Sequence, residues 1–308
     1  MRPRSALLIA MVLAAPALLL AMVLSQETLQ GWNEQVQRTD AEMQQRLAAG
    51  ARFMWIDESP DRRDRLRQGE ILVEPAQEKS PLSVPHGLVH DWIGAVFIPN
   101  TTIKAVFSVL NSFERYPDFY RPTVVSAKLL EDSGNKQRFS MVLLEKAPFV
   151  TAAVESEYIS QKTCIDARHC YSVIYSTRIQ QIEDYGEPSQ HTLPPDRGDG
   201  FVWRLYSIER FEERDGGVYA EFEALGLSRD IPFAIRWLVR PIVRHLPRDS
   251  MIGTLQKTRD AVRANKISSD ELLTLKPKGA PIGGGHVRPP APTVKRAPPT
   301  KQASNSGK

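Results

Sequence analysis

The sequence predicts an α+β domain in which an antiparallel sheet closes around one long C-terminal helix. Six strand-like runs follow one another between residues 123 and 227. The dipeptide Asp215-Gly216 separates the last two runs and is typical of a two-residue hairpin turn. The segment after Asp230 is helix-like and mostly apolar, and a helix of that composition must lie on another element. The preceding strands are the only candidate, so we expect a curved sheet, a closing helix and a cavity between them.

Residues 1–25 have the pattern of a signal peptide or a membrane anchor. Arg2 and Arg4 precede a run without charge from Ala6 to Leu24. The run is longer than a usual signal core and approaches the length that spans a bilayer. A cleaved signal ending at Ser25 and an uncleaved anchor therefore both stay open. Either predicts an exported chain, periplasmic or anchored to the membrane by the N-terminal segment, because the arginines stay inside.

The main domain is expected over residues 85–265, with an accessory region on each side. Residues 26–84 should be helical and extended, including a helix-prone segment and a strand from Gly69 to Pro75. Residues 266–308 are rich in Pro, Gly, Ser and Lys and predict a disordered basic tail. The tail supplies part of the net charge of +4. Because no basic stripe with interleaved aromatics occurs elsewhere, we expect no nucleic acid partner.

The main domain is expected to contain one strand, two short helices, six strands and a long helix, in that order. A strand from Gly87 to Ile98 leads into a helix with one apolar face, formed by Ile103, Val106, Phe107 and Leu110. A second short helix or turn follows. The strands after it are expected over residues 123–130, 137–145, 150–161, 171–182, 201–211 and 218–227.

This order, with the opening VHDWIGAVFIPNTTIKAVFSVLNSFERYPDFYRP and the closing LGLSRDIPFAIRWL, resembles the START-like (SRPBCC) superfamily. Its members include lipid-transfer domains, polyketide cyclases and coenzyme-Q-binding proteins. The resemblance covers Pro85 to about Ala264. It implies a helix-grip fold, with about seven antiparallel strands wrapped around the C-terminal helix and a hydrophobic tunnel between them. The superfamily has no universal catalytic motif, so the resemblance implies no catalytic residue and no cofactor.

Cys164 and Cys170 are the two cysteines of the chain and flank five residues between two strand-like runs. That spacing fits a hairpin loop. In an exported protein such a pair predicts a disulfide that clamps the hairpin.

Counting outward from Asp215-Gly216 gives the register of the last hairpin. Arg210 then faces Glu221, and Ile208 faces Glu223, on one side. The other side is more apolar and should face inward; it carries Trp203, Leu205, Ser207, Phe211, Ala220, Phe222, Ala224 and Gly226. Arg210–Glu221 would then be an outer ion pair worth a few tenths of a kcal/mol. The opposite orientation, with Arg204, Arg210, Glu221 and Glu223 inside, would suggest catalysis or head-group binding.

We therefore predict a ligand cavity beneath the closing helix. Its expected lining residues are Trp92, Phe107, Trp203, Leu205, Phe222, Ala224, Trp237 and Leu238. Arg236, Arg240 and Arg244 form one basic stripe on the helix, which is either a solvated face or a contact with an anionic membrane surface. None of the histidines has a spacing that suits zinc, so no metal site is expected.

The predicted function is non-enzymatic binding, and transfer, of a hydrophobic ligand such as a lipid or an isoprenoid. A rival is a polyketide cyclase or hydratase acting on an aromatic substrate. That chemistry needs an acid or a base inside the cavity, and the sequence shows none that clearly points inward. A third alternative is a scaffold whose interior is filled by its own side chains.

Overall fold

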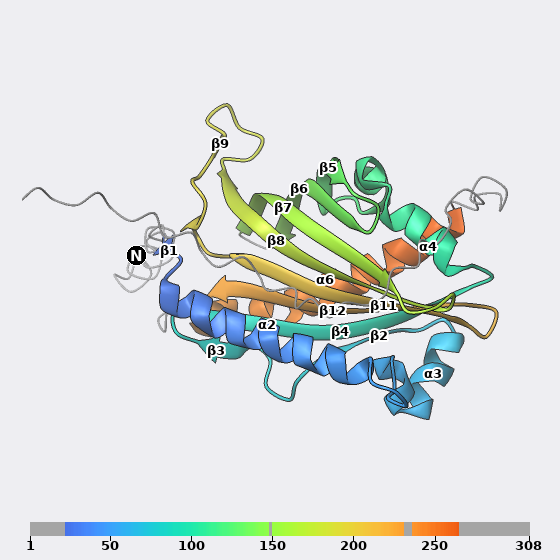
Figure 1. Ribbon diagram of the computed structural model, residues 1–308. Helices are drawn as coiled ribbons and strands as arrows, with labels where there is room; N and C mark the ends of the chain where they lie inside the picture. The colour runs from blue at the N-terminus through green and yellow to red at the C-terminus, as the bar shows by residue number, and fades with distance from the viewer. Residues whose placement is uncertain (1–21, 148–149, 231–235, 265–308) are drawn as a thin grey trace, which may run out of the picture. The chain divides into compact units, whose positions relative to one another are not determined.

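The computed structural model describes residues 22–147, 150–230 and 236–264, and these belong to one compact unit, Met1–Ile267 (Figure 1). The side chains of residues 236–245 lie outside the description. So do residues 1–21, which make up most of the predicted signal or anchor, and residues 265–308, which include the whole predicted tail, 266–308.

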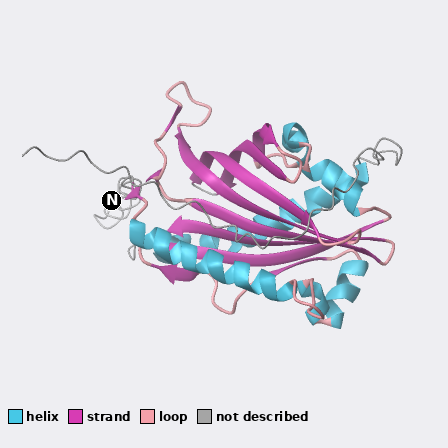
Figure 2. Cartoon of the chain, viewed as in Figure 1, coloured by secondary structure: helices cyan, strands magenta, loops and turns pink. Residues whose placement is uncertain are grey.

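The core of the unit is one antiparallel sheet of ten strands (Figure 2). Eight of them form a continuous path in the order β2-β4-β12-β11-β8-β7-β6-β5, while β3 pairs with β4 and β9 pairs with β8. The strands are β2 (Ile71–Pro75), β3 (Leu82–Val84), β4 (Gly87–Pro99), β5 (Val124–Asp132), β6 (Lys136–Ala147), β7 (Val150–Cys164), β8 (His169–Glu183), β9 (His191–Thr192), β11 (Arg204–Arg214) and β12 (Gly217–Arg229). The predicted antiparallel sheet is confirmed, but the strand count is higher than seven because β2, β3 and β9 join it.

Helices cover both faces of the sheet (Figure 1). We call the face under the C-terminal helix the inner face and the opposite one the outer face. The inner face carries α6 (Arg236–Ala264), α4 (Ile103–Leu110), η3 (Phe113–Arg115) and α5 (Tyr116–Phe119). The outer face carries α2 (Gln26–Arg46), η2 (Trp55–Glu58) and α3 (Pro60–Arg67).

The outer layer is built from the region before residue 85. Ser25 caps α2 by accepting a hydrogen bond from the Thr28 amide at 3.1 Å. Trp32, Val36 and Met43 recur at helical spacing and are buried against the sheet. The short apolar cluster Met54-Trp55-Ile56 docks on the same face, where it is buried with β2 and β4. Residues 26–67 therefore form a packed layer of the same unit, and residues 71–84 add β2 and β3 to its sheet.

On the inner face, α6 lies close to the strands. Leu255 is fully buried, and a Cβ at Gly94 of β4 would come within 2.9 Å of its side chain. Glycine at this position permits the close approach of helix and sheet. The Tyr120 and Thr258 hydroxyls lie 3.0 Å apart and tie the segment after α5 to α6. The predicted long closing helix is thus confirmed from Arg236 onward.

The last hairpin has the predicted turn and register. Asp215 and Gly216 both have positive φ angles, 55° and 75°, as a type I′ turn requires. Arg210 pairs with Glu221 and Ile208 with Glu223. At the other end of the sheet, β1 (Met22–Val23) pairs with β10 (Arg197–Gly198). Among the helices that the structure describes, none is both long and apolar enough to cross a membrane.

Candidate ligand-binding site on the inner face

A cavity lies between the inner face of the sheet and the layer formed by α4, η3 and α5. The cavity is small: the volume open to the centre of a water-sized sphere is about 20 Å³, which holds about one water molecule. Apolar and polar groups share its wall. The lining residues are Phe107, Leu110, Asn111, Phe113, Tyr116, Gln137, Phe139, Ser160, Lys162, Ser172, Ile174 and Glu209.

Strand register places the polar wall of this cavity. Ser172 of β8 pairs with Lys162 on one side and with Glu209 on the other. Directly paired residues project to the same face of a sheet, so the three form one row across β7, β8 and β11. Beyond Glu209 the row continues through Phe222 and Gly94, where α6 covers the sheet. The row of polar residues therefore meets the apolar part of the inner face under α6 at Phe222.

Glu209 is the most unusual group in the row. Within the described part of the chain, its carboxyl group has no hydrogen bond or ion pair. Burial raises the pKa of Glu209 to about 7, because desolvation penalises the charged form. A carboxyl group that titrates near neutrality can donate or accept a proton at physiological pH.

The neighbours of Glu209 share its desolvated surroundings. The Tyr116 hydroxyl donates to the Leu110 carbonyl at 2.6 Å, and burial and the charge of Glu209 raise the pKa of Tyr116. Lys162 places its Nζ 4.5 Å from the centre of the Phe107 ring, a cation–π contact. Burial lowers the pKa of Lys162. The site thus combines an acid, a base and aromatic walls in a poorly solvated space.

The structure brings several of the predicted lining residues together. Phe107, Phe222, Trp92 and Ala224 all pack in the inner-face core with α6. Leu205 packs against a neighbouring aromatic cluster under η3. The side chains of Trp237 and Leu238, and of the basic stripe Arg236, Arg240 and Arg244, lie outside the described residues.

Trp203 does not join this group. It precedes β11 and is buried in the outer-face cluster with α2. Strict alternation along the strand had suggested the inner face. Alternation holds from Leu205 to Phe211, but the regular pairing ends at Arg204: the Trp203 amide donates to Leu227, the residue that Arg204 already faces, so the periodicity no longer applies there.

Glu209 and Lys162 were missed by the sequence reasoning, although the sequence contained a signal for the first. Counting outward from Asp215-Gly216 puts Glu209 on the same face as Leu205, Ser207 and Phe211. We expected that face to be apolar, so Glu209 received no role. Placing Lys162 in this row requires the register of β7 against β8, which the cysteine hairpin sets.

The opposite, outer face holds a second buried polar group, which corrects another expectation. Arg210 and Glu221 form the predicted pair, with Nε and Oε1 2.6 Å apart, but both side chains are fully buried. Arg210 also bonds Glu223 at 2.7 Å, and the Ile56 amide donates to Glu221. The alternative orientation, with these charges lining the inner cavity, is wrong, since α2 and η2 cover them.

The buried polar group around Arg210 extends to Asp91. Burial and the charge of Glu223 raise the pKa of Asp91 to about 7. Gln77 donates a hydrogen bond to its carboxylate at 2.7 Å. Among the residues that the structure describes, this group included, no three or more His, Cys, Asp or Glu side chains are arranged to hold a metal ion.

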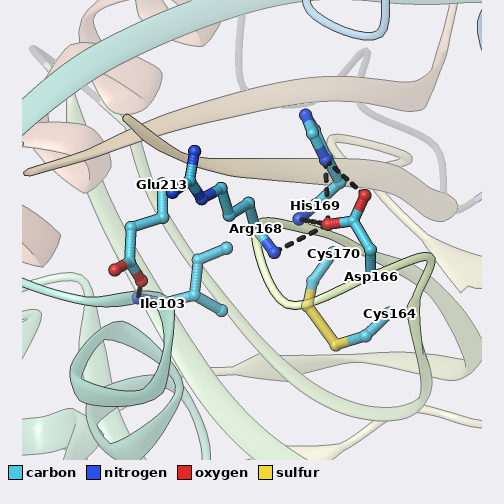
Figure 3. The surroundings of a disulfide bond; sticks show 7 residues. All are labelled: Ile103, Cys164, Asp166, Arg168, His169, Cys170 and Glu213. Atoms are coloured by element: carbon cyan, nitrogen blue, oxygen red, sulfur yellow. Dashed lines mark hydrogen bonds and ion pairs between the residues drawn. A yellow bond between two sulfur atoms is a disulfide. The ribbon is translucent and has the colours of Figure 1, made fainter. Parts of the chain in front are cut away.

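The cysteine hairpin closes the end of β7 and β8 next to α4. Cys164 and Cys170 are disulfide-bonded, with Cα atoms 4.0 Å apart, as predicted (Figure 3). In the loop, Asp166 accepts hydrogen bonds from the amides of Arg168 and His169. On the other side of the same view, Glu213 accepts from the Ile103 amide at 2.9 Å and so fixes the start of α4.

No protein-family model and no curated protein matches the chain. Solved structures do. A STAR-related lipid transfer protein from Xanthomonas axonopodis is 17% identical with a TM-score of 0.40, over 62% of this chain and 98% of that one. An aromatase/cyclase from Streptomyces is 10% identical with a TM-score of 0.38, over 57% and 94%. A human lipid transfer and protein localization domain is 10% identical with a TM-score of 0.37, over 68% and 97%.

The chain's own topology decides the fold. An antiparallel sheet opens with β4 and the short helices α4 and α5, continues through consecutive strands, and closes on α6. The resemblance of the sequence implied this arrangement. The chain therefore has the helix-grip fold that this resemblance implied.

Proposed function

We propose that the chain binds a hydrophobic small molecule, such as a lipid or an isoprenoid, between the inner face of the sheet and the helices that cover it. The ligand's apolar part lies along Phe222, Ala224 and Trp92. Its polar end meets Glu209 and Lys162. Removing apolar surface from water drives such binding, at roughly 25 cal/mol per Å².

One observation carries this proposal: Glu209 is a desolvated carboxyl group without a partner in the described structure, which lines the cavity and pairs across the sheet with Phe222 of the apolar core under α6. A fully buried polar group that makes no hydrogen bond costs about 1–3 kcal/mol, and the half-buried Glu209 carries part of that cost. A ligand with a hydroxyl, carbonyl or amine group would remove that cost. The same contact would orient the ligand with its polar end toward α4.

The cavity must enlarge when it takes a ligand. Ligand pockets typically have volumes of about 300 Å³ or more, far above the room for about one water found here. The sheet is tied by continuous pairing from β2 to β5, whereas α4 is only eight residues long. We expect the helical layer to move and the sheet to keep its shape.

The experiment is a titration of the full chain with a fluorescent fatty acid. Ala224→Trp fills the apolar wall and should weaken binding at least tenfold. Overpacking costs about 1–3 kcal/mol, which a domain of this size survives. Ala41→Trp, on the exposed side of α2, is the matched control and should bind as the wild type does. Equal binding by both variants would contradict the proposal.

A second candidate, the cyclase or hydratase, is favoured by the pKa of Glu209, which suits a general acid or base at neutral pH. In that case Glu209→Gln would abolish turnover of a small polyketide-like aromatic substrate and leave its binding intact. Loss of binding without any turnover in the wild type would favour the binding function.

A further inference from the structure

The start of the described chain is fixed to one end of the sheet. Met22 and Val23 pair with Gly198 and Arg197. The Leu24 amide donates to the Asp196 carbonyl at 3.0 Å. Figure 1 shows β1 at the end of the unit where the β9 loop also lies. The chain therefore enters the domain at a defined place.

No spacer separates the apolar N-terminal run from the folded domain. Leu24, the last residue of the run from Ala6, is 8% exposed and packs in the outer-face cluster with Trp32 and Leu227. The next residue, Ser25, caps α2. Cleavage after Ser25 would remove a β-strand pairing, a core side chain and a helix cap at once. The fold thus argues against the cleavage position that the sequence suggested.

The same end of the domain exposes apolar side chains. Val23 is 60% exposed and Phe201 is 37% exposed, two of the four exposed large apolar residues in the described part of the chain. The loop that carries Phe201 is held to the end of β12, because the Arg229 amide donates to the Gly200 carbonyl at 2.8 Å. Arg197, paired with Val23, is exposed as well.

We propose that the apolar run is retained as a membrane anchor, with Ala6–Ala21 as the spanning part, and that the end of the domain bearing Val23, Arg197 and Phe201 rests on a lipid bilayer. A span needs roughly 17–25 apolar residues, and the sixteen residues of Ala6–Ala21 approach that length. Exposed apolar groups suit the bilayer interface, and arginine suits lipid phosphates. The disulfide fits an oxidising compartment on the far side of that membrane.

A single introduced cysteine can report this orientation. The chain has two cysteines and they are bonded to each other, so a new one supplies the only free thiol. Phe201→Cys places a label at the proposed contact. Ser133→Cys places it in the exposed turn between β5 and β6, whose Asn135 carbonyl accepts from the Lys162 amide. That turn lies toward the cysteine hairpin, the opposite end of β8 from its pairing with β9.

The test uses the full chain in vesicles of phosphatidylcholine and phosphatidylglycerol, with a polarity-sensitive dye on each cysteine. The dye at Phe201→Cys should shift to the blue and be quenched by brominated lipid, and the dye at Ser133→Cys should do neither. Val23→Cys should repeat the Phe201→Cys result. Equal responses at both ends, or none at Phe201→Cys and Val23→Cys, would overturn the docked orientation. A mature chain whose mass lacks the run Ala6–Leu24 would overturn the anchor.

Discussion

Lys162 and Glu209 lie in one row across the sheet, with only Ser172 between them. The two side chains form no ion pair with each other. Two strand spacings separate them, about 10 Å. An acid and a base held apart by this distance in a poorly solvated cavity can each contact a different part of one ligand. This arrangement is the basis of the predictions that concern the inner face.

The first prediction concerns the pH dependence of stability. The folded-state pKa of Glu209, about 7, is raised above the ordinary value of 4.5. Below pH 4.5 the stabilisation linked to the bound proton is fully present, and it is lost as the pH rises toward 7. Glu209→Gln removes this titration. At pH 8 the variant should be more stable than the wild type by about 1–3 kcal/mol.

Urea unfolding at pH 5 and pH 8 measures the effect. Glu187→Gln, a change at an exposed position, should leave the difference between the two pH values unaltered. If Glu209→Gln shows the same loss of stability with pH as the wild type, the Glu209 carboxyl is not desolvated.

The second prediction concerns Arg210. Arg210→Met leaves Glu221 and Glu223 buried without their cation, which should cost about 3–5 kcal/mol. Arg178→Met is the control, since Arg178 pairs with Glu157 at a side-chain exposure of 38% and should cost at most about 1 kcal/mol. Denaturant midpoints decide between them. Similar costs for the two variants would show that the outer-face network is solvated.

The third prediction concerns the disulfide. Without reductant the purified chain should show no free thiol, and denaturation with reductant should expose two. Replacing both cysteines by serine should lower the free energy of unfolding by about 2 kcal/mol, because the closed loop is short. Thiol labelling and urea unfolding test these statements. Two reactive thiols in the native chain would refute the clamp.

The fourth prediction concerns the basic stripe of α6. Replacing Arg236, Arg240 and Arg244 together by Gln should leave equilibrium ligand binding unchanged and slow ligand delivery to anionic vesicles, because the attraction to anionic head groups is lost. The ratio of transfer rates to anionic and to neutral vesicles measures this. An unchanged ratio would assign the stripe to a solvated face.

The sequence predicted the elements that depend on local patterns. Asp215-Gly216 determined the turn and register of the last hairpin, and the cysteine spacing determined the clamp. What it could not predict was the layer over the outer face. The burial of Arg210 depends on α2 and η2, which are far away in sequence, so the ion pair looked like a surface pair.

The site was predicted only in part, because some of its properties depend on segments that are far apart in the sequence. Phe222 and Ala224 followed from strand alternation, whereas the importance of Glu209 depends on how α4 covers it. Desolvation is a tertiary property, and the spacing of residues in one strand does not report it. Trp203 shows the limit of alternation at a strand end.

Native mass spectrometry of the purified full chain tests the central claim most directly. The account predicts that the wild type carries one non-covalently bound hydrophobic molecule, taken up during expression or from an added lipid extract. Ala224→Trp should carry none, and Ala41→Trp should resemble the wild type. A folded wild-type chain that stays at its unliganded mass with lipid extract present would contradict the account and leave an interior filled by its own side chains.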